Sequence, residues 1–500
     1  MRFRSPTSGW TMGLRKKQAS SGMLDFGIDS QPLEECLTAH GGLPLVAETF
    51  RALGGRAAVE RHLKLKARER GISEGDMVED FLLLLASGGE CFDDFAVLAE
   101  DQGLAATLGR TLAGPDAARK FLYRFHDEDM QAKRPQHVLA WVPEETTALQ
   151  GLAKVNATLV QEFQRRQPEV TGFTVDMDAS LIESHNIEAK AHYDGGRGYQ
   201  PEFAIWAETL MVLADEFRDG NVPAAMDPLS VVKAAFGVLA PEVLAKLTMA
   251  FRGDSACYNH ELLNWLRNPA REGPQGKIRF AISACMSPQL RAVIEKVPAK
   301  AWQPYRRPDG QASAAEVDEL RSWADVVFVP SDGPSDKTLA PDRYIAIRIQ
   351  KRQGELFADG TSVKHFAIVT NDWDADGGKV LWWQRQKAGT VEQVHDMIQN
   401  GLGLGTVPCQ RFGANAAWTR LNVLTHNVLQ ALKWIALPPE ERHAHPKRMR
   451  FRVFALAGRV THSARRTWLR LAGTAAQIAR QIAVRAKLWM APPSQPVLVT

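Results

Sequence analysis

Three acidic residues have the types and positions needed for metal chemistry. Asp178 ends the segment FTVDMDA (residues 173–179), where apolar and polar side chains alternate as in a half-buried β-strand. Asp254 follows the apolar segment TMAFRG, and the end of a strand is where ligand-binding groups of α/β sheets usually lie. Glu392 falls within a helical segment, residues 390–400. Each residue alone is more often a helix cap, a turn residue or a solvated side chain.

Together these carboxylates can do more than each can alone. Hard divalent cations prefer oxygen ligands, and Mg²⁺ is held by a few carboxylates while it keeps some of its waters. Asp178, Asp254 and Glu392 therefore predict a site for Mg²⁺, with Mn²⁺ as an alternative ion, and two such ions about 4 Å apart catalyse in-line phosphoryl displacement. Asp176 lies on the same strand face as Asp178, so the first acid is left open between these two residues.

The surrounding pattern predicts an α/β protein with an RNase H-like catalytic core. Three strands in a meander, followed by alternating helices and strands, place this core at residues 151–436, with a β-rich insertion at about residues 300–385. Before the core, residues 41–150 read as an all-α domain for DNA binding or dimerisation. A loosely ordered basic segment (residues 1–40) and a basic helical tail (residues 437–500) complete the predicted organisation.

Composition narrows the class of protein. The chain has 500 residues, 45% of them hydrophobic, and a net charge of only +4, which is typical of a soluble globular protein. Its five cysteines are dispersed and form no CxxC pair, which argues against a disulfide framework and against a zinc site. The basic N-terminal segment lacks the apolar core of a signal peptide, and the longest apolar run, FLLLLA, is too short to span a bilayer. We therefore expect a cytoplasmic protein without a membrane partner.

The charge is unevenly distributed. Residues 441–500 contain twelve Lys and Arg and one acid, a net charge of +11, which leaves −7 for the preceding residues. Such a tail is either a solvated helical surface or a contact for a polyanion, and a basic amphipathic helix can also lie on a membrane. With the predicted metal site in the same chain, DNA is the simplest partner, which implies a nucleoid-associated location.

Several ordered segments resemble a known family. They run from about residue 171 to residue 436 and read DASLIESH, GGRGYQPEFAIWAE, FRGDSACYNHELLNWLR, GPQGKIRFAISACMS, KAGTVEQVHD and VPCQRFGANAAW. They resemble the DDE transposases of bacterial insertion sequences, in the branch with a β-rich insertion between the second Asp and the Glu. The resemblance implies an RNase H-like fold and Mg²⁺-dependent cleavage of transposon ends, followed by strand transfer into target DNA.

Site residues follow from the same resemblance. Asp178 resembles the family's first acid, Asp254 the second and Glu392 the third. Many related enzymes carry a basic residue four positions before the Glu and a Lys seven positions after it, where this chain has Ala388 and Gln399. Arg385 and Lys387 are the nearby basic residues that the resemblance implies as DNA contacts.

The implied partners are double-stranded DNA, both as terminal inverted repeats and as target, and a second copy of the chain, because paired ends normally require two protomers. One alternative is a catalytically decayed or repurposed DNA-binding protein, for which the departures at Ala388 and Gln399 argue. Another is a structure-selective nuclease on the same fold, which the helical N-terminal region and the insertion make weaker. Cleavage at the terminal repeats would indicate the transposase, and binding without cleavage would indicate the decayed DNA-binding protein.

Overall fold

A computed structural model describes most of the chain, namely residues 27–66, 68, 70–307, 310, 319–330, 341–351 and 356–490. By its contacts the chain separates into two compact units, residues 1–35 and residues 36–500. The account below concerns the second unit, because only residues 27–35 of the first are described. None of the described helices combines the length and the hydropathy needed to cross a membrane.

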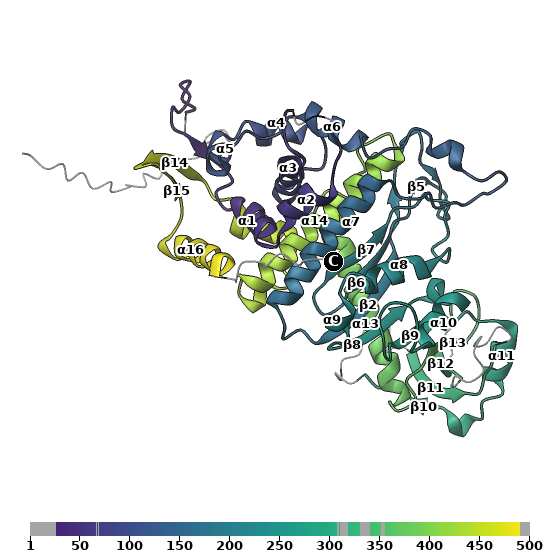
Figure 1. The fold of residues 1–500 in the computed structure, drawn as a ribbon. Helices are drawn as coiled ribbons and strands as arrows, with labels where there is room; N and C mark the ends of the chain where they lie inside the picture. Colours follow the sequence, from purple (N-terminus) through teal and green to yellow (C-terminus); the bar gives the residue numbers. More distant parts are fainter. Residues whose placement is uncertain are drawn as a thin grey trace, which may run out of the picture. The chain divides into compact units, whose positions relative to one another are not determined.

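A nine-stranded mixed sheet lies beside the helical part of this unit (Figure 1). Its strand order is β10-β11-β12-β13-β9-β8-β2-β6-β7. Strands β2, β8 and β9 are parallel neighbours, and every other pairing is antiparallel. The bounds are β2 (Gly172–Ala179), β6 (Glu202–Trp206), β7 (Met211–Glu216), β8 (Thr248–Gly253), β9 (Arg279–Ser283), β10 (Gln303–Pro304), β11 (Glu319–Val326), β12 (Arg343–Lys351) and β13 (Val363–Thr370).

The predicted meander is present as β2, β6 and β7, but its Gly-rich turn lies elsewhere. Gly195, with a φ of +89°, turns the chain between β4 (Lys190–Ala191) and β5 (Arg197–Tyr199). These two strands form a small separate sheet with β3 (Ile182–Glu183), in the order β3-β5-β4. A glycine suits this turn because a side chain at positive φ is strained.

The β-rich insertion extends the central sheet. β13 pairs with β9, with Ile368 opposite Ser283, so β9 is no longer an edge strand with unpaired N–H and C=O groups. The insertion ends earlier than the predicted residue 385, because helix α13 (Gly377–Gln399) begins after Asp376, whose side chain accepts from the backbone N–H of Lys379 at 3.1 Å. Residues 308–309, 311–318, 331–340 and 352–355 of the predicted insertion lie outside the described residues.

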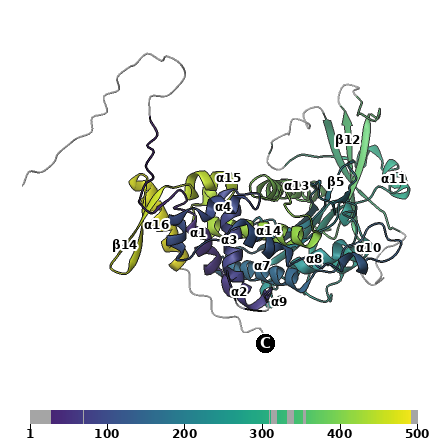
Figure 2. The same cartoon turned by 90° about the horizontal axis from the view of Figure 1, so that it is seen from above.

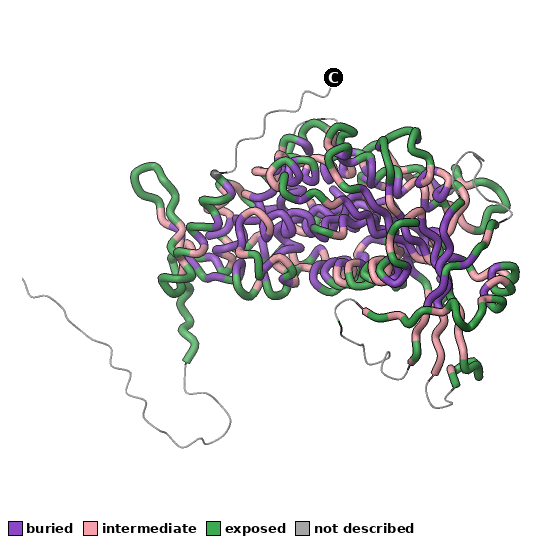
Figure 3. Tube along the Cα trace, turned by 90° about the horizontal axis from the view of Figure 1, so that it is seen from below, coloured by how far each residue is buried: buried purple, intermediate pink, exposed green. Residues whose placement is uncertain are grey.

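Helices predicted over residues 41–150 are present and pack around one later helix. That helix, α14 (Phe412–Ile435), is buried at every position from Phe412 to Lys433, as expected of a helix surrounded by others. It contacts α1, α3, α6 and α7 as well as β7, and Figure 3 shows the buried core continuing from the helices into the sheet. The domain boundaries predicted at residues 150 and 436 stay predictions.

The N-terminal helices are α1 (Pro44–Ala52), α2 (Gly55–His62), α3 (Glu74–Ser87), α4 (Asp94–Ala99), α5 (Gln102–Leu108), α6 (Pro115–Tyr123) and α7 (Thr147–Arg166). The core region adds α8 (Pro228–Phe236), α9 (Pro241–Leu244), α10 (His260–Arg267) and α11 (Pro288–Glu295). The short strand β1 (Leu37–Thr38) precedes them all.

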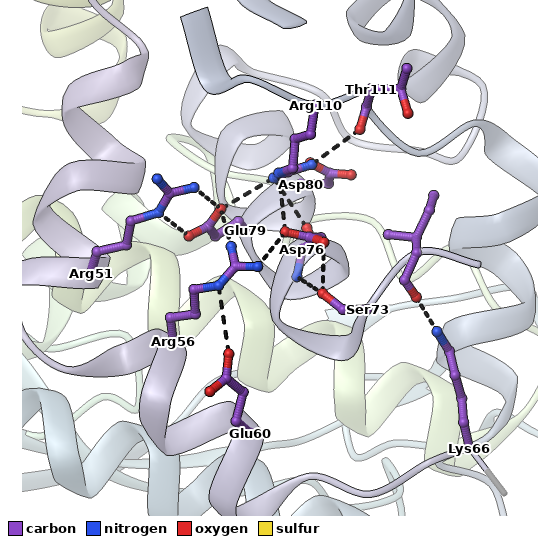
Figure 4. A network of polar contacts seen from close by, with 11 residues as sticks. Arg51, Arg56, Glu60, Lys66, Ser73, Asp76, Glu79, Asp80, Arg110 and Thr111 are labelled. Carbon is purple, nitrogen blue, oxygen red and sulfur yellow. Dashed lines mark hydrogen bonds and ion pairs between the residues drawn. The ribbon is translucent and has the colours of Figure 1, made fainter. Parts of the chain in front are cut away.

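Buried charges tie the first helices together (Figure 4). Glu79 and Asp80 on α3 are fully buried. Arg51 of α1 donates to Glu79 at 2.6 Å, and Arg110, which follows α5, donates to Asp80 at 2.7 Å. Burial raises the pKa of Asp80 to about 6, although Arg110 opposes the shift. Buried carboxylates need such partners, so these contacts fix how α1 and α3 lie against each other.

The C-terminal region differs from the predicted helical tail. It contains α15 (Pro446–Met449), then a hairpin of β14 (Gly458–Ser463) and β15 (Arg466–Leu471), and only then α16 (Ala475–Met490). The turn residues Ala464 and Arg465 have positive φ, 48° and 62°, which suits a two-residue hairpin turn. The helical prediction does not hold for residues 458–471, where Val460, Thr461 and Thr467 favour a strand, and β1 completes the small sheet by pairing with β14. Residues 491–500 of the predicted tail lie outside the described residues.

Candidate active site

Asp178 and Asp254 lie at the same edge of the sheet. β2 and β8 are parallel neighbours, and their register places Asp176 opposite Arg252. Asp178 and Asp254 each follow two residues later, so both come at the carboxyl ends of adjacent strands, where functional groups of α/β sheets gather. The Asp178 side chain is 32% exposed, and Asp254 is half-buried. The side chain of Asp254 also accepts from the backbone N–H of Ala256 at 2.9 Å, which fixes the turn after β8.

Lys387 of α13 completes this group. Its Nζ lies 2.8 Å from Oδ2 of Asp178, and its side chain is only 7% exposed. Burial lowers the pKa of Lys387, but the charges of Asp178 and Asp254 raise it further, so the net shift is upward. Lys387 is therefore an ammonium ion under the electrostatic influence of both carboxylates.

Asp176 has a different role from Asp178. It is fully buried and accepts two hydrogen bonds from Arg252, each at 2.6 Å, one on each carboxylate oxygen. Burial raises the pKa of Asp176, and Arg252 opposes the shift. A strand with two Asp on one face is thus accommodated by an arginine for Asp176 and by a lysine for Asp178, which makes Asp178 the accessible candidate for the first acid.

Glu392 is exposed on α13, and its side chain makes no hydrogen bond or ion pair with another described residue. Its position on the helix nevertheless relates it to the site. Gln399, seven residues later and nearly in line with Glu392, donates to Oγ of Ser180 at 2.9 Å and to the carbonyl of Leu181 at 3.2 Å. Lys387 and Gln399 both reach the end of β2, so Glu392 belongs to the part of α13 that runs past the site.

A divalent metal fits Asp178 and Asp254 better than it fits all three acids. Both carboxylates are partly exposed and supply hard oxygen atoms, and Lys387 shows that a cation is stable beside them. Mg²⁺ is often held by one or two carboxylates together with phosphates of the substrate. No group of three or more His, Cys, Asp or Glu side chains that could hold a metal ion occurs within the described part of the chain.

A groove of about 780 Å³ leads from Asp254 along the insertion strands. Arg291, Arg321 and Arg385 line it together with apolar side chains such as Phe366. The guanidinium of Arg385 also lies 4.8 Å from the ring centre of Tyr305. The two basic residues predicted as DNA contacts thus have separate positions, Arg385 in the groove and Lys387 against Asp178.

Two further titratable residues lie beside the site. Glu202 of β6 is buried and accepts from Arg218 at 2.6 Å. Burial raises the pKa of Glu202 to about 8; Arg218 opposes this, whereas Glu216, Asp254 and Asp178 add to it. The sequence held one signal, a glutamate inside the otherwise apolar strand EFAIW, because a buried carboxylate requires a specific partner.

His395 is the second. Its ring lies 5.6 Å from that of Phe203, between centroids, and burial lowers the pKa of His395 to about 4 although Asp178 raises it. The imidazole is therefore neutral and packs between α13 and β6. His395 follows Glu392 by three residues, a spacing that puts both on one side of a helix but does not distinguish a packing role from a ligand role.

Comparison with known proteins relates this arrangement to a family. A search of curated proteins found no match. Among solved structures the chain is similar to the piggyBac transposase in a synaptic complex with hairpin DNA, with 12% sequence identity over 90% of this chain and 80% of that chain, at a TM-score of 0.40. The model of the family described as transposase DDE domain group 1 matches residues 34–489. Since this match spans most of the sequence, the chain belongs to the DDE transposase family of group 1.

Proposed function

We propose that this DDE transposase cleaves the ends of a transposon and joins them to target DNA, with Asp178, Asp254 and Glu392 as its three acids. The observation that carries the proposal is the convergence of Asp178 and Asp254 at one sheet edge beside α13, the helix that bears Glu392. We further propose that the element is a bacterial insertion sequence and that two protomers act on its paired ends.

The strand order supports this assignment. Strands β7, β6, β2, β8 and β9 are consecutive in the sheet, with β6 antiparallel to its two neighbours and β2, β8 and β9 parallel. A three-strand meander followed by two parallel crossovers is the order expected of an RNase H-like core. In such a core the acids of β2 and β8 come together, as Asp178 and Asp254 do here.

Metal chemistry completes the proposed site. Mg²⁺, or Mn²⁺ in its place, held by Asp178 and Asp254, with Glu392 on α13 as the proposed third ligand, would polarise phosphate oxygens and stabilise the charge that develops on them. The residues of the chain itself contribute by holding β2, β8 and α13 in place. The Asp176–Arg252 pair joins β2 to β8, and Arg252 also donates to the carbonyl of Trp383 at 2.7 Å, which joins both strands to α13.

Gln384 holds the same helix on the next strands. Its Nε2 donates to Oγ of Ser283 at 3.1 Å and to the carbonyl of Gly253 at 3.3 Å. The residue after Gly253 is Asp254, so the helix and the second acid are positioned by the same contact. Effective catalysis depends on such placement, because a small displacement of reacting groups costs rate.

The groove beside Asp254 is our candidate path for DNA. Its arginines, Arg291, Arg321 and Arg385, suit a phosphate backbone because guanidinium groups bind phosphate with paired hydrogen bonds. Lys387 is buried against Asp178, so we assign it to the acids and Arg385 to the nucleic acid.

One observation favours a second candidate function, a decayed or repurposed DNA-binding protein. The Glu392 side chain has no hydrogen-bond or ion-pair partner among the described residues. Ala388 and Gln399 stand where related enzymes carry basic residues. Such a protein would bind ends without cleaving them.

A cleavage assay on duplex DNA carrying the element's own ends, with Mg²⁺ or with a chelator, tests the proposal. We expect nicking that depends on Mg²⁺ and disappears in Asp254→Asn, while gel-shift binding of the same duplex persists. Binding without nicking by the wild type would establish the second candidate instead. Nicking that depends on DNA junctions and ignores the end sequence would indicate a structure-selective nuclease.

A further inference from the structure

The β14–β15 hairpin has two different faces. Cross-strand partners include Arg459 with Arg470, Thr461 with Trp468, and Ser463 with Arg466. Because side chains alternate along a strand, these six residues share one face, which we call the arginine face. The other face carries Val460, Leu469 and Leu471, which are buried or half-buried against the rest of the protein. Figure 2 shows the hairpin extending from the helical part of the unit.

Two arginines of the arginine face, Arg466 and Arg470, carry charge that no described acidic side chain neutralises. Both residues are exposed, and the side chain of neither makes an ion pair or a hydrogen bond with another described residue. Residues 458–471 include four arginines and no acid. Arg459 and Arg470 also lie directly opposite each other, an arrangement of like charges that weakens a sheet.

Other basic residues nearby are used within the fold. Arg485 of α16 donates to Glu48 of α1 at 2.8 Å, and Arg452 donates to Glu441 at 2.9 Å. Some basic residues of the C-terminal region therefore form ion pairs within the protein. Arg466 and Arg470 differ because neither guanidinium group has an acidic partner among the described residues.

We propose that the arginine face of the β14–β15 hairpin is a binding surface for duplex DNA. A two-stranded ribbon has the width of the major groove, and Arg, Ser, Thr and Trp supply donors for phosphates and base edges. The exposed Trp468 at the centre of the face, 52% exposed, is explained by a partner that covers it. This inference rests on the proposed function only in taking DNA as the substrate.

Salt dependence of binding tests this surface with the full-length protein. The probe is a fluorescent duplex of random sequence, titrated between 50 and about 200 mM salt. We measure the slope of the logarithm of the binding constant against the logarithm of the salt concentration. We expect the double variant Arg466→Ala/Arg470→Ala to reduce the magnitude of this slope by about 1.8, because each phosphate contact contributes about 0.9. The control is Lys233→Ala/Lys246→Ala, which removes two exposed positive charges from the region of α8 and α9 and should leave the slope unchanged.

A second pair of variants separates the two faces. Ser463→Lys adds a charge to the arginine face, and Thr467→Lys adds the same charge to the opposite face of the hairpin. We expect the first to steepen the slope by about 0.9 and the second to leave it unchanged. Equal slopes for these two variants, or equal slopes for the two double-alanine variants, would overturn the proposal. Charge-dependent binding to phosphatidylserine vesicles with an unchanged DNA slope would overturn it too and would identify a membrane surface.

The cleavage assay separates this inference from the proposed function. A protein that fails to cut end DNA but shows the face-dependent slopes binds DNA through the hairpin without being the proposed enzyme. A protein that cuts end DNA with slopes insensitive to the hairpin is the proposed enzyme with another DNA-binding surface.

Discussion

The ammonium of Lys387 lies 2.8 Å from a carboxylate oxygen of Asp178, across 209 residues of sequence. The side chain is nearly buried and is influenced by the charge of Asp254 as well. Two carboxylates at one sheet edge repel each other unless a positive charge lies near them. In the absence of a metal ion, Lys387 supplies that charge.

We therefore predict that Lys387→Met lowers the melting temperature in a chelating buffer and increases the rise in melting temperature that Mg²⁺ produces. The first effect follows because loss of one partner from a buried pair costs about 3–5 kcal/mol, and the partial exposure of Asp178 places this case at the low end. The second follows because the metal no longer competes with an ammonium ion. Differential scanning calorimetry with and without Mg²⁺ measures both.

Lys379→Met is the matched control, because Lys379 lies on the same helix and is exposed. It should change neither quantity. If Lys387→Met gave the same Mg²⁺-dependent rise as the wild type, Lys387 would not compete for the metal position.

Asp178→Asn and Asp254→Asn should abolish cleavage and leave binding of end DNA largely intact. Each change removes a negative charge that a metal requires, and neither removes a contact with phosphate. Cleavage and gel-shift assays on the same duplex measure the two properties. Retention of full cleavage by Asp178→Asn would remove this residue from the catalytic set.

Asp176→Asn should instead unfold the protein more easily. It leaves the buried guanidinium of Arg252 without its charged partner, which costs about 3–5 kcal/mol. Urea denaturation measures this loss, and Asp178→Asn, at a partly exposed position, provides the comparison. Equal stability of Asp176→Asn and wild type would show that the pair with Arg252 is not essential to the fold.

Glu392→Gln should abolish cleavage without changing stability. The residue is exposed, and substitutions at such positions usually change the free energy of unfolding by less than about 0.5 kcal/mol. Asp396→Asn, one turn later on the same helix and also exposed, should retain cleavage. Similar cleavage by Glu392→Gln and wild type would mean that another residue is the third acid.

Lys433 provides a pH-dependent test away from the site. It is buried on α14 and donates to the carbonyl of Ala444 at 3.0 Å. Burial lowers the pKa of Lys433 to about 7, although Glu441 opposes the shift. Below pH 7 the lysine is protonated in both states; between pH 7 and about 10.4 only the unfolded state holds the proton, so stability rises with pH in this window.

Lys433→Met lacks this rise. We expect the variant to be more stable than the wild type at pH 6 and the difference to shrink toward pH 10, by up to about 4 kcal/mol. Urea denaturation of both proteins at matched pH values measures the difference, which cancels the titration of other groups. A difference that stays constant with pH would show that Lys433 remains charged in the folded protein.

Local patterns predicted the strands of the acids well. Alternation of apolar and polar residues identified β2, and the positions of Asp178 near the end of β2 and of Asp254 after β8 could be predicted without a structure. Partners distant in sequence were not readable. Asp176 looked equivalent to Asp178 because its arginine, Arg252, lies 76 residues away, and only the parallel register of β2 and β8 brings them together.

Two further features of the fold were not predicted from the sequence. The hairpin at residues 458–471 was read as helix because Leu and Ala also recur at helical spacing in RRTWLRLAGTAAQ. The insertion strands were recognised, but their attachment to β9 was not, because strand pairing over long separations leaves no local pattern.

The central position of α14 has a consequence for synthesis of the chain. Helices α1, α3, α6 and α7 are made first, yet the surface on which they pack belongs to residues 412–435. While these residues are still inside the ribosome, the emerged helices expose apolar faces that have no native partner, the condition in which nascent chains aggregate or recruit chaperones. Protein released by premature termination before residue 412 would therefore lack the partner of its N-terminal helices, so truncated products are expected to be degraded.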